Sequence, residues 1–267
     1  MKYFILLFCF LMQSGFAADA LRSEADKLWQ KRDDKASLEQ ALAKYEQLSK
    51  QNPSDLEILV LLSRGHFLLG EFHHTDKESK LKEFQKGRSF GEMAMETNHE
   101  YKKLIEKKKS VDEALHVLTL KEVPAIYWSA VNLGKWSKSN GVFSSLSYKN
   151  QILEMIKKVE ELSPDYFYGA VPRYWAGFYA IAPGIAGGDM NKSKKKFEEA
   201  LKVAPGYLGT KVLMAEVYWT KKDDRKEFRK NLEEVLKSND SIKELAPENN
   251  LEKKKAEKLL KEEDELF

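Results

Sequence analysis

Cysteine is nearly absent from this chain of 267 residues, in which Cys9 is the only one. A lone cysteine cannot form a disulfide framework within the chain. Cys9 also lies in an N-terminal segment that we expect to be removed, so the remaining chain has neither a thiol nucleophile nor a thiolate ligand for a metal. Cysteine chemistry is therefore excluded.

Glycine and proline are also few, at 14 and 7 residues. A fold built from β-strands needs such residues at many short turns. The hydrophobic residues, at 42% of the chain, are sufficient for a buried core. The composition therefore predicts an all-α fold.

An excess of charge of one sign is missing as well. Lys and Arg number 45 and Asp and Glu number 42, which leaves a formal net charge of +3. Binding to nucleic-acid phosphates requires a one-sided basic surface, not a high total of charges. We expect no nucleic-acid partner.

Motifs for catalysis and metal binding are lacking. The chain has no Gly-x-Ser-x-Gly sequence, and no carboxylate pair stands out among its 42 acids. His66, His73 and His74 make a metal site conceivable, but the His-Glu-x-x-His spacing is absent. We expect a protein that is not an enzyme and that holds no metal or cofactor.

A long apolar run occurs at the N-terminus, from Tyr3 to Met12. It follows Lys2 and precedes two small-residue sites, at 15–17 and 18–20, which is the pattern of a secretory signal peptide. A retained membrane anchor is the alternative, but the run is about half of the ~20 residues that span a bilayer. We predict a signal peptide over residues 1–20 and a single helical repeat domain over residues 21–267.

Lipid attachment at Cys9 is not favoured. Bacterial lipoprotein signals have a small residue directly before the cysteine, and Phe8 stands there. The sequence therefore predicts an exported protein without a lipid anchor.

Internal similarity appears as a spacing of 0, 4, 7 and 12 residues. The first three positions share one stripe of a helix, and a proline at the fourth ends that helix. A second apolar helix follows each proline, as in tetratricopeptide repeats, although the distances between the stops exceed the ~34 residues of the standard repeat. The alternative is a set of amphipathic helices that merely end in proline. The copies are Ala41, Tyr45, Leu48 and Pro53; Ile152, Ile156, Val159 and Pro164; Ser193, Phe197, Ala200 and Pro205; and a weaker one at Gly87, Gly91, Ala94 and His99.

The residues outside these repeats form an insertion at about 100–150 and a charged C-terminal capping helix at about 248–267. Within the insertion the pattern predicts an amphipathic helix over 101–120, a buried helix that begins at Pro124, and a loop over 137–147. We therefore expect an irregular helical repeat array, an α-solenoid.

The sharpest motif is Pro-Gly-x-x-Gly-Gly-Asp within Val171–Asp189, preceded by Ala125–Gly134 and followed by Lys194–Leu201. Together these segments resemble the T-component family of TRAP transporters. The resemblance implies a periplasmic, helical, non-catalytic protein that works beside a TRAP solute-binding protein in the uptake of a small solute.

The candidate site residues are polar or aromatic side chains on the two presumed helices. Arg173 could bind a carboxylate of an organic anion, or it could pair with a helix C-terminus or a structural acid while its stem covers Tyr174. The aromatic rings could line a pocket or fill the core, and Asn132 must find a partner in the backbone or in a solute. The tentative ligand-binding set is Tyr127, Trp128, Asn132, Trp136, Arg173, Tyr174 and Tyr179.

The glycine-rich turn after this helix fails the test for a phosphate loop, because no Gly-Lys-Ser/Thr ending follows and no strand precedes it. We expect a tight turn in which Gly187 or Gly188 has a positive φ and Asp189 or Asn191 caps the next helix. The turn could still form a pocket edge with Pro183, Gly184, Gly187, Gly188 and Asp189.

Two other functions stay open. A repeat scaffold could bind peptides or proteins, although its expected asparagines and basic residues are replaced by apolar ones such as Leu59, Leu62 and Met214. An enzyme with a paired-carboxylate cleft is a more distant alternative. Exposed apolar faces would also permit a homo-oligomer.

Overall fold

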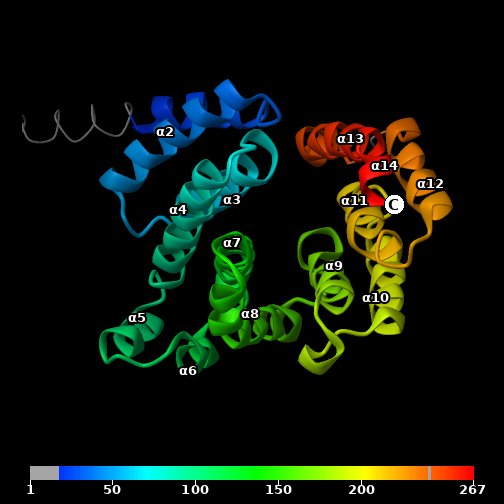
Figure 1. Cartoon of the computed structure of the whole chain (residues 1–267). Coiled ribbons are helices and arrows are strands. Elements are labelled where there is room, and N and C mark those ends of the chain that lie inside the picture. The colour runs from blue at the N-terminus through cyan, green and yellow to red at the C-terminus, as the bar shows by residue number, and fades with distance from the viewer. Residues whose placement is uncertain (1–17, 240–241) are drawn as a thin grey trace, which may run out of the picture. The chain divides into compact units, whose positions relative to one another are not determined.

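The computed structural model describes residues 18–239 and 242–267, and these residues form helices joined by short turns (Figure 1). The predicted signal peptide lies mostly outside the described residues. No strand occurs in the described part of the chain, so the predicted all-α class is confirmed. The stacked repeat array stays a prediction.

The chain divides into two compact units. The N-terminal unit ends at Met155 and the C-terminal unit begins at Ile156. The boundary falls within the helix α8 (Val142–Leu162). Neither unit has, over the ranges that the structure describes, a helix long and apolar enough to cross a membrane.

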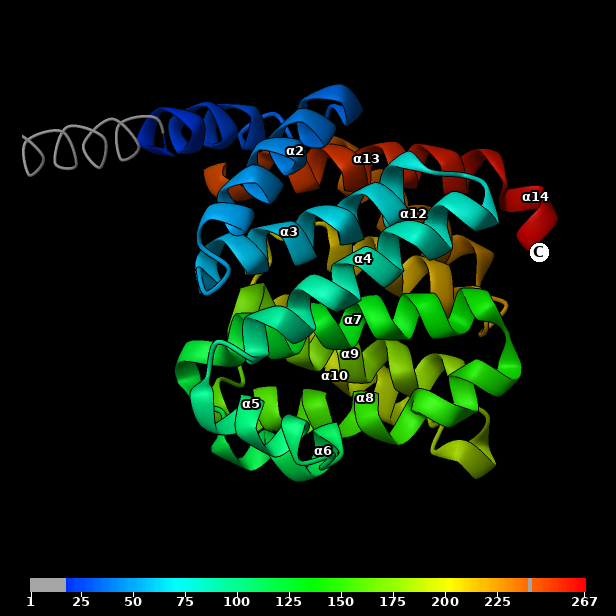
Figure 2. The same ribbon diagram turned by 90° about the vertical axis from the view of Figure 1, so that its left-hand side faces the viewer.

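The N-terminal unit is built around three helices, α3, α4 and α7, which pack against one another (Figure 2). Its other elements are short or lie at its edges. In chain order they are a helix over 18–29, α2 (Lys35–Gln51), α3 (Leu56–Leu68), the π-helical turn η1 (Leu69–His73), α4 (Lys77–Met95), α5 (His99–Glu106), α6 (Val111–Ala114), the 3-10 turns η2 (Leu115–Val117) and η3 (Leu120–Glu122), α7 (Val123–Asn140) and the first part of α8.

The C-terminal unit holds the remaining helices around two apolar clusters. Phe197 of α10 and Tyr218 of η5 belong to one cluster, and Phe228 of α12 and Val212 of α11 belong to the other. Its elements are the end of α8, α9 (Tyr166–Ile181), η4 (Gly184–Ala186), α10 (Met190–Val203), α11 (Gly209–Leu213), the π-helical η5 (Met214–Trp219), α12 (Arg225–Lys237), η6 (Lys243–Leu245), α13 (Ala246–Lys261) and α14 (Glu263–Leu266).

The predicted stripes are buried and the predicted stops end their helices. Tyr45, Ile156 and Phe197, at the second position of three copies, are all fully buried. Helix α2 ends two residues before Pro53, α8 two residues before Pro164, and α10 two residues before Pro205. The weaker copy is also buried at Gly87, Gly91 and Ala94, and α4 ends at Met95.

Two predictions within the insertion are wrong. The single helix over 101–120 is broken, because Lys108 adopts a φ of 58° and a Ser110–Glu113 capping box then starts the short α6. The loop over 137–147 is helical, because α7 continues to Asn140 and α8 begins at Val142, with only Gly141 between them. The buried helix from Pro124 is confirmed: α7 begins at Val123, with the proline in its first turn.

Candidate functional site

The predicted site residues fall into two groups, one in each unit. Helix α7 of the N-terminal unit carries Tyr127, Trp128, Asn132 and Trp136. Helix α9 of the C-terminal unit carries Arg173, Tyr174 and Tyr179 and leads into the glycine-rich turn. In each unit an arginine lies over an aromatic ring.

The arginine of the N-terminal unit is Arg64, on α3. Its guanidinium carbon lies 5.5 Å from the ring centroid of Trp29 and 5.6 Å from that of Trp128. Trp128 is 4% exposed and lies 5.4 Å from the Phe67 ring and 5.1 Å from the Tyr127 ring. We call these five residues the Arg64 cluster.

Sequence reasoning missed Arg64 and Trp29. One signal was present, because Arg64 interrupts the apolar run of α3, Leu-Glu-Ile-Leu-Val-Leu-Leu-Ser-Arg-Gly-His-Phe-Leu. A cation in such a run needs a compensating contact, here two aromatic faces.

Trp136 lies apart from this cluster. It is half-buried, and its ring meets Tyr148 of α8 edge-on at 5.8 Å. Trp136 and Trp128 therefore pack against different neighbours, although the eight-residue spacing places them on one face of α7.

Asn132 is fully buried and cross-links helices of the N-terminal unit. Its Nδ2 donates to the carbonyl oxygens of Ser63 at 3.0 Å and Trp128 at 2.8 Å. The Ser63 hydroxyl in turn donates to the Gly87 carbonyl at 2.6 Å. Of the two predicted kinds of partner for Asn132, the structure therefore shows backbone.

The arginine of the C-terminal unit, Arg173, is 7% exposed. One of its nitrogens, Nη1, donates to the Tyr168 carbonyl at 2.9 Å, and Nη2 donates to the Phe167 carbonyl at 3.4 Å. The guanidinium carbon lies 4.1 Å from the centroid of the Tyr207 ring. The contacts of Arg173 are thus structural, but its partners are backbone carbonyls near the start of α9 and a tyrosine ring, and not the helix C-terminus or acid that the sequence suggested.

The carbonyls that Arg173 binds belong to a left-handed segment. Phe167, Tyr168 and Gly169 have φ angles of 44°, 55° and 72°. Two consecutive aromatic residues in this region are costly for L-amino acids, and surrounding contacts must hold them there. The Tyr168 ring stacks on Tyr207 at 6.4 Å, and Arg173 covers the same ring.

The other aromatic side chains of α9 gather around Trp175. Its ring lies 5.9 Å from that of Tyr179, nearly parallel, and 5.8 Å from that of Tyr174, edge-on. The indole nitrogen donates to Glu160 at 2.9 Å, and the Lys192 ammonium lies 5.7 Å from the Tyr179 ring centroid. These contacts fix the rings from one side while Tyr174 and Tyr179 stay half-buried.

The glycine-rich turn has the geometry that the sequence predicts. Gly187 has a φ of 100°, and the Asp189 carboxylate accepts hydrogen bonds from the backbone of Asn191 and Lys192 at 2.9 and 3.0 Å. The bond from Lys192 lowers the pKa of Asp189. A side chain at Gly188 would overlap the Ala182 carbonyl, which explains the glycine there.

His66 is buried among acids in the N-terminal unit. Its Nδ1 lies 2.6 Å from Glu83 and its Nε2 3.6 Å from Glu46. Burial lowers the pKa of His66, but the two carboxylates outweigh burial and raise it above its usual value. Within 18–239 and 242–267, no three His, Asp, Glu or Cys side chains are placed to hold a metal ion.

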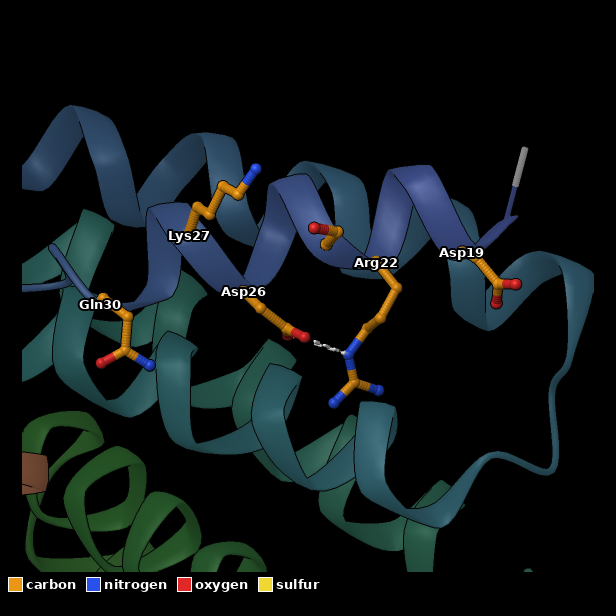
Figure 3. Close-up of a pocket in the computed structure, with 6 residues that line it drawn as sticks. Asp19, Arg22, Asp26, Lys27 and Gln30 are labelled. Carbon is orange, nitrogen blue, oxygen red and sulfur yellow. Dashed lines mark hydrogen bonds and ion pairs between the residues drawn. The ribbon is translucent and has the colours of Figure 1, made fainter. Parts of the chain in front are cut away.

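An open hollow runs along the helix over 18–29, lined by Asp19, Arg22, Ser23, Asp26, Lys27 and Gln30 (Figure 3). Two of its charged groups, Arg22 and Asp26, already bind each other and neighbouring residues. Arg22 donates to Asp26 at 2.9 Å and to Glu57 at 2.6 Å, and Asp26 accepts from the Tyr45 hydroxyl at 2.7 Å.

Over the described residues the fold is all-helical, and each unit carries an arginine that lies over at least one aromatic ring. Residues 34–267 match the family described as TRAP transporter T-component, and the chain belongs to this family. The resemblance predicted from the glycine-rich motif is thereby confirmed. No curated protein matches the chain.

Membership of this family implies an accessory role in TRAP transport and association with components of that system. The family is a transporter component and is not known as an enzyme.

Proposed function

We propose that the protein is a periplasmic, non-catalytic component that binds a small organic anion and works with a TRAP solute-binding protein. The observation that carries this proposal is that the Arg64 guanidinium lies over two tryptophan rings, those of Trp29 and Trp128. The predicted signal peptide supports export, and the buried stripes of α2, α4, α8 and α10 support a tetratricopeptide-like array.

A guanidinium that lies over aromatic rings donates from its edge, because its five N–H groups lie in the plane of the group. A carboxylate matches this edge with two parallel hydrogen bonds. The Arg64 cluster therefore suits an anionic solute with an apolar part, which Tyr127 and Phe67 would cover.

Arg173 has a different place in this proposal. Its nitrogens donate to two backbone carbonyls, so it positions Phe167, Tyr168 and Tyr207 and does not grip the solute itself. Tyr174 and Tyr179 would add apolar surface, and the turn from Pro183 to Asp189 would remain an edge of it.

The test is calorimetric titration of the exported protein with the TRAP solute-binding protein encoded nearest to it, with and without the carboxylates that copurify. We expect saturable association near micromolar Kd, about −8 kcal/mol. Arg64→Gln should abolish the effect of the carboxylate on this association. The glutamine amide has neither the positive charge nor the parallel N–H groups of the guanidinium.

Arg22→Gln is the matched control, because Arg22 also lies over an aromatic ring and pairs with acids but is outside the cluster. The proposed site would be contradicted if the carboxylate changed the association of Arg64→Gln as much as it changes that of the parent protein. A failure of the solute-binding protein to associate under any condition would favour the peptide or protein scaffold.

A further inference from the structure

The chain reverses direction between α7 and α8 (Figure 2), and three large apolar side chains at the start of α8 are exposed. Val142, Phe143 and Leu146 are 74%, 89% and 62% exposed. Isolated exposed apolar residues need no explanation, but three within one turn and a half of helix form a contiguous patch. We call these three residues the α8 tip.

The α8 tip is not a continuation of the core stripe. At about 100° per residue, Phe143 lies roughly 160° around α8 from Val159, which is fully buried. The exposed side chains therefore point away from the face that packs against other helices.

The backbone beneath the tip is held firmly. The Ser145 hydroxyl donates to the carbonyls of Ser137 and Gly141, each at 3.2 Å, and Asn140 donates to the Ser144 hydroxyl at 2.7 Å. The Trp136 ring packs on Tyr148 across the reversal. A rigid corner thus presents apolar side chains outward.

The stretch of sequence around the tip carries charges of one sign. Residues 123–153 contain three lysines, Lys135, Lys138 and Lys149, and no Asp or Glu, although Lys135 pairs with Glu71 of η1 at 2.6 Å. The chain as a whole has nearly equal numbers of the two signs, so this stretch departs from the composition. An apolar tip with basic residues next to it complements a surface that is negatively charged outside and apolar beneath.

We infer that the α8 tip inserts into the surface of an anionic phospholipid bilayer. Side chains that project from a corner fit a deformable surface, whereas a rigid protein partner would need a matching pocket. Phe143 and Leu146 would enter the boundary between headgroups and acyl chains, and Lys138 would lie at the headgroups. This inference goes beyond the proposed solute binding and does not depend on it.

The test is cosedimentation of the exported protein, its processed N-terminus checked by mass, with vesicles of phosphatidylcholine alone or with 30% phosphatidylglycerol. We expect binding to the anionic vesicles that weakens with salt. Phe143→Ser with Leu146→Ser should weaken it at least tenfold, because both inserted side chains are lost. Lys138→Gln should weaken it about fivefold.

Leu120→Ser is the matched control, because Leu120 is 64% exposed and lies before the other end of α7. We expect its binding to equal that of the parent protein. Absence of binding to either vesicle, or binding that the double substitution leaves unchanged, overturns the inference. A soluble oligomer that the double substitution dissociates would also overturn it, by assigning the tip to contact between copies of the chain.

Discussion

His66 and Glu83 form a buried pair, with the Nδ1 atom of the histidine 2.6 Å from a carboxylate oxygen of the glutamate. They join α3 to α4, and Glu46 of α2 faces the other ring nitrogen. The His66 ring also stacks on Phe90 at 5.5 Å. One imidazole ring therefore links three helices of the N-terminal unit.

This pair should make the stability of the protein fall as pH rises above neutrality. Burial opposes the charged form of His66, but Glu46 and Glu83 raise its pKa in the folded state. When the pKa of a histidine is higher in the folded protein than in the unfolded chain, protonation stabilises the folded state. This stabilisation is complete below the unfolded pKa of about 6.5 and is lost as the pH rises through the folded pKa. Lys86 weakens this shift without reversing it.

The measurement is the free energy of unfolding in urea at pH 6.0 and pH 8.5. His66→Gln should cost about 3 kcal/mol at pH 6.0, because Glu83 is left buried without its cation, and should cost less at pH 8.5. His116→Gln is the control, because His116 is exposed and binds only a backbone carbonyl. Equal costs at both pH values would show that His66 is not charged in the folded protein.

Gly87 and Asn132 pack so closely that their substitutions should not be additive. A Cβ atom at Gly87 would lie 2.4 Å from the Asn132 Oδ1 atom. Gly87→Ala should therefore destabilise the protein by about 2 kcal/mol, and Asn132→Ala by a similar amount through its lost hydrogen bonds.

The double variant Gly87→Ala with Asn132→Ala removes the overlap. We therefore expect it to lose at least about 1 kcal/mol less stability than the two single variants lose together. Urea unfolding of all four proteins measures this coupling. Additive costs would mean that α4 moves away from α7 and relieves the overlap by itself.

Two glycine-to-alanine substitutions should change the stability of the protein in opposite directions. Gly169 has a φ of 72°, and its Cβ would lie 3.1 Å from the Ala200 carbonyl oxygen. Gly134 lies inside α7, and a Cβ there would meet no atom within 4 Å. We expect Gly169→Ala to cost about 1–2 kcal/mol and Gly134→Ala to add about 0.5–1 kcal/mol of stability.

Thermal unfolding of the two variants against the parent protein checks this pair of predictions. Each variant serves as the control for the other, because both add one methyl group to a glycine. A stabilised Gly169→Ala would contradict the left-handed conformation at that position.

Local signals in the sequence predicted the local structure well. The stripe at Ala41 and Tyr45, the start of α7 at Pro124 and the cap at Asp189 each depend on residues within one or two helical turns. The Arg64 cluster could not be found in this way, because Trp29 and Trp128 lie far from Arg64 in the sequence and only packing brings them together.

The two wrong predictions have the same physical origin. The serines and glycine of 137–147 are typical of a loop, but hydrogen bonds across the reversal let both helices continue to Gly141. The periodic pattern of 101–120 indicates one helix, but Lys108 adopts a left-handed conformation that the pattern does not reveal. In both places local hydrogen bonds and backbone angles, which the apolar pattern does not encode, decide the backbone.

Arg173 should be replaceable neither by alanine nor by lysine. Its planar fork donates to the carbonyls of Phe167 and Tyr168 while its face covers the Tyr207 ring. Alanine removes all three contacts from a buried position, and we expect a loss of about 3 kcal/mol. Lysine keeps the charge but is a point donor without a flat face, so it should recover less than half of this loss.

The informative measurement is amide hydrogen exchange at Gly169 and Ala170 together with urea unfolding. Because Arg173 holds the left-handed segment, both variants should speed exchange there beyond the effect of lower global stability. Arg88→Lys is the control, since Arg88 also lies over a tyrosine ring but binds the Glu92 side chain and no strained backbone. Amide exchange and urea unfolding of Arg173→Lys that matched the parent protein would contradict this prediction. They would show that the positive charge alone holds the left-handed segment, without the planar guanidinium.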